Sequence, residues 1–149
     1  MATDFEPIWT ALLGRIESRV SGFKTITRKP KQQYGVEQYP VLEFVELDED
    51  PTQEGAEPPQ HKATATLGIV CRVTENDDSP FTQVNALLYA LRTALERQAT
   101  DHEDGTGVLG HYTNLGARVE SLSIGRVEKR WGEGVSEVWV KVPIEVTTY

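Results

Sequence analysis

The residue types best suited to metal chemistry gather in one glycine-rich segment, residues 99–116. The side chains are Asp101, His102, Glu103, Asp104 and His111. Imidazole and carboxylate groups are common metal ligands, but a specific site also needs a rigid frame and ordered supporting hydrogen bonds. Four glycines make such a frame improbable here. We therefore interpret the segment as a solvated polar loop and expect neither a metal nor a cofactor.

Patterns typical of other enzymes are absent from the sequence. There is no GxxxxGK[ST] phosphate loop, no HExxH and no CxxC. The glycines at 105, 107 and 110 do not follow a strong strand and open a helix, as a dinucleotide fingerprint requires. Cys71 lies on the apolar face of a predicted strand, so we expect a buried small side chain rather than a nucleophile. The chain is therefore predicted not to be an enzyme.

Composition narrows the class of protein further. The 149 residues carry a net charge of −8, are 38% hydrophobic and include one cysteine, which predicts a single domain over residues 1–149 without a disulfide, folding in a reducing cytosol. No apolar run approaches the roughly 20 residues of a membrane span, and the N-terminus does not resemble a secretory signal. The acidic balance argues against non-specific nucleic-acid binding as the main role.

Two amphipathic helices are predicted from apolar residues at three- and four-residue spacing. The first covers about residues 4–20, with Arg15 and Glu17 on the polar side and Gly22 as a C-terminal stop. The second runs from about 80 to 98, with Ser79 as its N-cap. The apolar stripes are Ile8, Trp9, Leu12, Leu13, Ile16 and Val20 in the first, and Phe81, Val84, Leu88, Leu91 and Leu95 in the second.

Five strands are predicted, at about 23–28, 41–47, 63–74, 117–130 and 135–148. The last alternates strictly, and its Pro143 favours an edge position or a bulge. The strand before it changes phase near Gly125, as a β-bulge would cause. The predicted fold is α+β, in the order α-β-β-β-α-β-β: a mainly antiparallel sheet of about five strands with two amphipathic helices packed on it.

A long exposed loop is predicted at 48–61, DEDPTQEGAEPPQH, because three prolines and five acids suit neither a helix nor a central strand. The loop belongs to an uneven charge map. The candidate interface residues are the basic stretch Arg28, Lys29 and Lys31; the acids Asp48, Glu49, Asp50 and Glu54; the basic final hairpin Arg126, Lys129 and Arg130; and the tryptophans Trp131 and Trp139.

Separate positive and negative surfaces favour head-to-tail association, in which a patch on one subunit meets a different patch on the next. The pairing suggested by the sequence joins the basic stretch to the acidic loop of a neighbour. The alternative is that these charges belong to solvated loops that keep the protein soluble.

Several segments together resemble the tail terminator proteins of long-tailed bacteriophages, also called minor tail or tail completion proteins. They are FEPIWTALLGRI and GFKTITRKPKQ, PVLEFVEL before the acidic loop, ATLGIVCRV, SPFTQVNALLYALRTAL and the closing VWVKVPIEV, in order over most of residues 4–148. None of these segments carries a catalytic motif.

The resemblance implies a non-enzymatic virion protein at the neck, assembled in the host cytoplasm. Such proteins form a homo-hexameric ring that caps the tail tube, ends tail polymerisation and offers the surface to which the head attaches through its connector or stopper protein. Phage DNA would pass through the channel without specific binding, and no membrane is involved. The alternatives are another neck component such as a head–tail stopper, a tail tube subunit, or a small α+β ligand-binding domain or enzyme.

Overall fold

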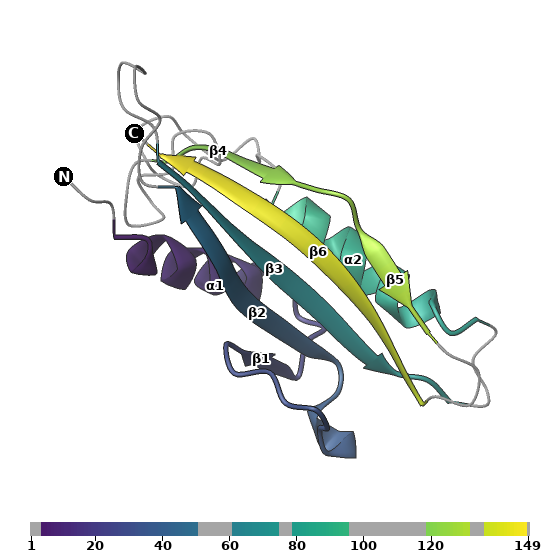
Figure 1. Ribbon diagram of the computed structural model, residues 1–149. Helices are drawn as coiled ribbons and strands as arrows, with labels where there is room; N and C mark the ends of the chain where they lie inside the picture. The colour runs from purple at the N-terminus through teal and green to yellow at the C-terminus, as the bar shows by residue number, and fades with distance from the viewer. Residues whose placement is uncertain (1–3, 51–60, 75–78, 96–118, 132–135, 149) are drawn as a thin grey trace.

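The computed structural model describes residues 4–50, 61–74, 79–95, 119–131 and 136–148, and Figure 1 shows how they are arranged. The helices are α1 (Glu6–Arg19), α2 (Thr82–Leu95) and a short 3-10 helix η1 (Val36–Gln38). The strands are β1 (Thr25–Thr27), β2 (Val41–Asp50), β3 (His61–Arg72), β4 (Val119–Ile124), β5 (Glu128–Arg130) and β6 (Glu137–Thr148). Neither α1 nor α2 is long and apolar enough to cross a lipid bilayer.

The strands form one open sheet in the order β1-β2-β3-β6-β4, with β5 pairing farther along β6. The centre of the sheet is the antiparallel pair β3 and β6, in register from His61 opposite Thr148 to Arg72 opposite Glu137. Only the short edge strand β1 runs parallel to its neighbour, β2. The predicted α+β fold with two helices on a mainly antiparallel sheet is confirmed, and the sheet is mixed because of β1.

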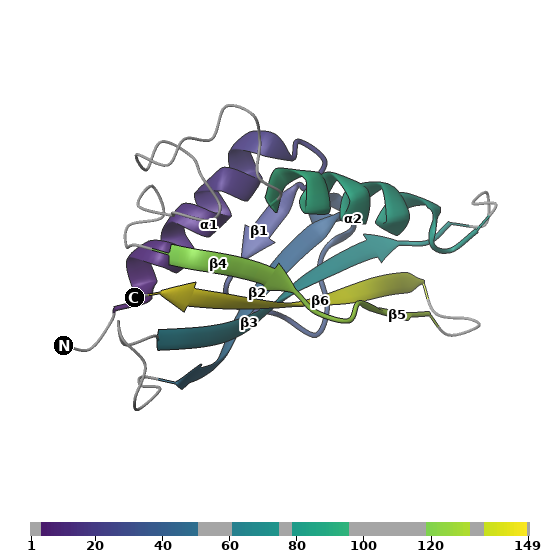
Figure 2. The same ribbon diagram turned by 90° about the horizontal axis from the view of Figure 1, so that it is seen from above.

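Both long helices cover the same face of the sheet, as Figure 2 shows from above. Alternate residues of the strands point toward them, because successive side chains of a strand face opposite ways. Trp9 of α1 packs on Phe44 of β2 with 5.3 Å between ring centroids. The buried residues on this face include Leu42, Phe44, Ala65, Leu67, Ile69, Cys71, Val138, Val140, Val142, Ile144 and Val146. The predicted apolar stripes of the two helices therefore meet one continuous apolar sheet face.

The two helices approach each other at Arg15 and Gly22, whose roles differ from the prediction. Arg15 is buried, and its Nε donates to the carbonyl oxygen of Ala94 at 2.9 Å, where the end of α2 favours a cation. The helix α1 ends at Val20 in an extended conformation (φ −119°, ψ 109°), without a left-handed glycine. Gly22 instead makes room for Leu87, whose Cδ2 would lie 2.5 Å from an added Cβ.

The predicted loop at 48–61 was wrong at its ends, because strand pairing continues into the acidic segment. Glu49 lies opposite Ala63 and Asp50 opposite Lys62, so the three acids from 48 to 50 belong to β2. A bulge between Glu46 and Glu49 accommodates this, with the Asp48 N–H donating to Thr64 Oγ1 at 3.1 Å. Residues 51–60 lie outside the described residues.

The predicted strand 117–130 is two strands, because pairing with β6 is interrupted beside Pro143. The ladder of β4 ends at Ile124, and that of β5 begins at Glu128. Between them the Gly125 N–H still donates to the Pro143 carbonyl oxygen at 2.8 Å. The predicted irregularity near Gly125 is confirmed. An edge position for Pro143 is wrong, since β6 has neighbours on both sides, and the interruption is what accommodates a residue without an N–H.

A glycine inside α1 provides a test of this description. Gly14 is exposed, and an added Cβ would meet no atom within 4 Å. We expect Gly14→Ala to raise the free energy of unfolding by about 0.5–1 kcal/mol, because alanine loses less backbone entropy in a helix. Thermal denaturation followed by circular dichroism measures the change. Gly22→Ala is the matched control and should give no gain, since it meets Leu87. Equal stabilisation by both substitutions would contradict the packing described here.

Candidate assembly surfaces

Arg28 is the centre of an ion-pair cluster that ties the end of β1 to α1 and β2. Its guanidinium donates to both carboxylate oxygens of Glu6, with Nη2 2.9 Å from Oε2, and to Glu46 Oε2 at 3.0 Å. The hydrogen bonds from Arg28 lower the pKa of Glu6, and those to Glu6 raise the pKa of Arg28. The guanidinium also lies 5.4 Å from the centre of the Phe44 ring. The charge of this candidate interface residue is thus neutralised largely within its own chain.

The rest of the basic stretch is exposed and follows the same edge of the sheet. Lys29 closes a small turn in which its N–H donates to Thr27 Oγ1 at 2.9 Å. The backbone N–H of Lys31 donates to the hydroxyl of Tyr34 at 3.0 Å, and Lys31 itself is exposed. Lys29 and Lys31 therefore remain available for contacts with a partner.

The acids Asp48, Glu49 and Asp50, here called the acidic edge, are all exposed at the end of β2. The strand β1 covers the free side of β2 only as far as Glu43. No other strand among the described residues lies along that side, so the acidic edge borders an uncovered strand. The fourth acidic candidate, Glu54, lies outside the described residues.

The opposite edge of the sheet carries the cations Arg126, Lys129 and Arg130, here called the basic edge. All three are exposed. Lys129 Nζ donates to Asn85 Oδ1 of α2 at 2.7 Å, a neutral partner. Arg130 lies over the Trp139 ring, 5.0 Å from its centre, and its Nη2 is 3.8 Å from Glu128 Oε2. Glu128 thus partly compensates Arg130, whereas the neutral partner of Lys129 leaves the charge of that side chain uncompensated.

The two candidate tryptophans differ in exposure. Trp131 follows β5 and is 40% exposed. Trp139 points to the outer face of the sheet, the face opposite the helices, but it is only partly exposed. It packs there against the small cluster of Tyr39, Val41 and Val70. Trp139 therefore supports the outer face, and Trp131 is the more accessible of the pair.

Two tyrosines fasten the segment before β2 onto this outer face. The hydroxyl of Tyr34 donates to Glu43 Oε2, and that of Tyr39 donates to Glu137 Oε1. The two rings meet edge to face with 6.0 Å between centroids. Burial, with the hydrogen bond to a carboxylate second, raises the pKa of each tyrosine to about 12. Sequence reasoning missed this pair, since Tyr39 and Glu137 are 98 residues apart.

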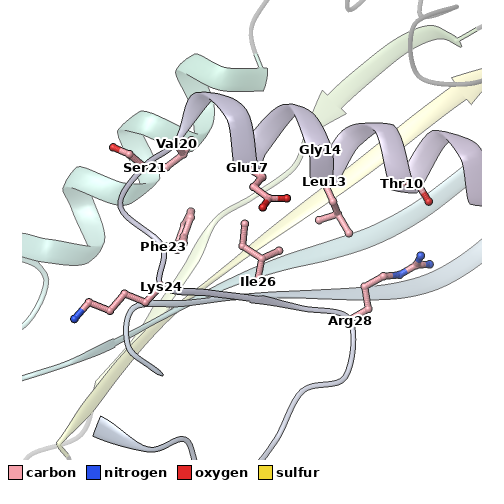
Figure 3. A pocket seen from close by; sticks show the side chains of 10 residues that line it. All are labelled: Thr10, Leu13, Gly14, Glu17, Val20, Ser21, Phe23, Lys24, Ile26 and Arg28. Atoms are coloured by element: carbon pink, nitrogen blue, oxygen red, sulfur yellow. The ribbon is translucent and has the colours of Figure 1, made fainter. Parts of the chain in front are cut away.

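A groove of about 690 Å³ lies between α1 and β1 and was also missed. Figure 3 shows Leu13 and Glu17 pointing from α1 toward β1, with Phe23 and Ile26 pointing back toward the helix. The groove is open to solvent and has an apolar floor flanked by charges of both signs. It is lined by Thr10, Leu13, Gly14, Glu17, Val20, Ser21, Phe23, Lys24, Ile26 and Arg28.

The described residues also bear on the catalytic alternatives. Cys71 is fully buried, and burial raises the pKa of its thiol to about 12, as expected for an inert structural cysteine. Within the described ranges, no three His, Cys, Asp or Glu side chains are placed to hold a metal ion. The glycine-rich segment with its histidines lies outside those ranges.

No protein-family model matches the chain, and no curated protein matches it. A solved structure described as "Virion of native gene transfer agent (GTA) particle" contains a similar chain. The TM-score is 0.55 at 11% sequence identity, over 93% of this chain and 92% of that chain. At this identity the likeness shows a shared fold, and it extends over nearly the whole length of both chains.

The tyrosine contacts predict a dependence of stability on pH. A folded-state pKa of about 12 against 10 for an ordinary tyrosine means that the contribution is fully present below pH 10 and is lost as the pH rises toward 12. We expect Tyr34→Phe with Tyr39→Phe to lower the free energy of unfolding at pH 8 by about 1–3 kcal/mol. The variant should also lose less stability than the original chain between pH 10 and 11.

Urea denaturation at pH 8, 10 and 11 gives both quantities. Tyr89→Phe is the control, because that side chain is 74% exposed. An identical pH profile for the double variant and the original chain would contradict a stabilising role for these hydroxyls.

Proposed function

We propose that this chain is a structural protein of a virion and acts by assembly, without catalysis. The observation that carries the proposal is the fold shared with a chain of a gene transfer agent virion over 93% and 92% of the two lengths. The charge distribution supports it as well, because the acidic edge and the basic edge lie on different strands of one sheet. The buried, protonated state of Cys71 gives no support to a catalytic thiol.

The specific role proposed is that of a tail terminator. Six copies form a ring on the completed tail tube, end its polymerisation and offer the head-attachment surface. Support comes from the resemblance of the sequence segments over residues 4–148, which fall on α1, β2, β3, α2 and β6 in the same order. The partners are the tail tube protein and the head–tail connector or stopper protein, and the protein works at the neck of the virion after assembly in the host cytoplasm.

In such a ring, phage DNA passes through the channel without specific binding. A net charge of −8 disfavours tight contact with phosphates, because neutralising phosphates requires clustered Lys and Arg facing the duplex. The cations Lys129 and Arg130 lie on the edge strand β5, where they suit contacts between proteins.

A second candidate is another neck component, such as a head–tail stopper, or a tail tube subunit. The similar structure is described as that of a whole particle, so the shared fold supports these roles equally. What separates them is the position of the protein in the virion.

Electron microscopy of the purified protein mixed with tail tubes tests the proposal. We expect six-fold rings at one end of each tube, and tubes that no longer lengthen when tube subunits are added. Tubes without the protein are the control. Incorporation along the tube would identify a tube subunit. Monomers alone in the presence of tubes would contradict the terminator role.

A further inference from the structure

We propose that copies of this chain associate head to tail, with the acidic edge of one copy against the basic edge of the next. This proposal rests on the proposed function, because a ring needs a contact between neighbouring copies. It adds which surfaces of the two copies meet. The acidic edge is Asp48, Glu49 and Asp50 at the end of β2. The basic edge is Lys129 and Arg130 in β5 and Arg126 just before it. Both are exposed, and they are opposite in sign.

The two edges cannot meet within one chain. The strands β3 and β6 lie between β2 and β5, so the edges are about 14 Å apart across the sheet. Along the strands they are offset by a further 20 Å or about six residues, because Glu49 is level with Val146 of β6 and Lys129 with Val140. Figure 1 shows the end of β2 and the end of β5 at opposite corners of the sheet. The basic edge of a second copy is therefore the complementary surface available to the acidic edge.

The basic stretch at residues 28–31 is less suited to this contact than the sequence suggested. It follows β1, on the same edge of the sheet as the acidic end of β2, and Arg28 already bonds to Glu46 of β2. The charge of Arg28 is therefore already compensated within its own copy, by Glu6 and Glu46. A head-to-tail contact instead needs complementary patches on different parts of the surface, which the acidic and basic edges provide.

The backbone supports the same arrangement. Each neighbouring pair from β2 through β3 and β6 to β5 is antiparallel, so β2 and β5 run in opposite directions. A second sheet in the same orientation, shifted by about 20 Å along the strands, would bring its β5 antiparallel to the uncovered side of β2. Charged residues on an edge strand usually prevent such pairing. Opposite charges on the two edges make the pairing selective for this partner.

Charge reversal on the full chain tests the contact, with sedimentation velocity as the measurement. We expect concentration-dependent association of the original chain. It should weaken at 0.5 M salt, where the Debye length is about 4 Å compared with about 10 Å at 0.1 M. Arg126→Glu with Arg130→Glu should weaken the association by about tenfold or more, and so should Asp48→Lys with Glu49→Lys. The four substitutions together in one chain should restore it, because the charges are exchanged. Circular dichroism checks that each variant folds.

Lys29→Glu with Lys31→Glu is the matched control, because it makes the same charge change on the other basic segment. This control should associate like the original chain. Stronger weakening by the control than by the reversals at Arg126 and Arg130 would overturn the proposal. So would a failure of the fourfold exchange to restore association, or an original chain that stays monomeric up to about 1 mM. If Arg130→Glu disturbs the packing on Trp139, Arg126→Glu alone tests the same edge.

The tube experiment separates this proposal from the proposed function. Rings on tail tubes with every charge variant would overturn the contact and leave the terminator role supported. Association that depends on the two edges, together with no binding to tubes, would support the contact and contradict the terminator role.

Discussion

Burial of a single sheet face against α1 and α2 determines what the rest of the molecule can do. The apolar side chains of β2, β3 and β6 that face the helices are almost fully buried, and Trp9 of α1 packs on Phe44 of β2. Hydrophobic burial of this extent fixes the register of each strand, since a shift by one residue would turn the apolar set to solvent. The register in turn places most polar side chains of these strands on the outer face or at an edge, while His61 and Thr148 are buried. The candidate interaction surfaces are therefore consequences of the core.

The outer face shows how that constraint acts on a segment whose regular structure is limited to the short 3-10 helix η1. Residues 31–39 cross this face, where the buried apolar contacts are limited to the small cluster of Tyr39, Val41 and Val70. Two tyrosine hydroxyls bonded to Glu43 and Glu137 supply the missing specificity, and Trp139 fills the space between. The edge of the sheet is organised in the same manner, by Arg28 bridging Glu6 and Glu46. Polar contacts here position segments that the core does not reach.

Local periodicity predicted the elements that the core dictates and failed where distant residues decide. The alternation of β3 and β6 and the stripes of α1 and α2 follow directly from their apolar spacing. The extension of β2 to Asp50 depends on pairing with β3, and no local pattern encodes a strand in an acidic segment. The charged residues show the same limit of sequence-based prediction most clearly. Sequence alone gave Arg28, Lys29 and Lys31 equal standing, but only the fold shows that Arg28 meets a carboxylate 22 residues away and another 18 residues away.

The positions of the charges, more than the net charge, determine in which orientation two copies can associate. A net charge of −8 by itself keeps identical copies apart, because like charges repel at every approach. Acids on the free side of β2 and cations in β5 allow a relative orientation of two copies in which opposite charges face each other. A contact between two different patches uses one patch on each copy and leaves the other patch open for a third copy. Such a chain of copies closes into a ring only if the rotation from one copy to the next divides a full turn. The twist and curvature of the sheet set that rotation, so the same core that fixes the two edges also decides whether such an assembly ends in a ring.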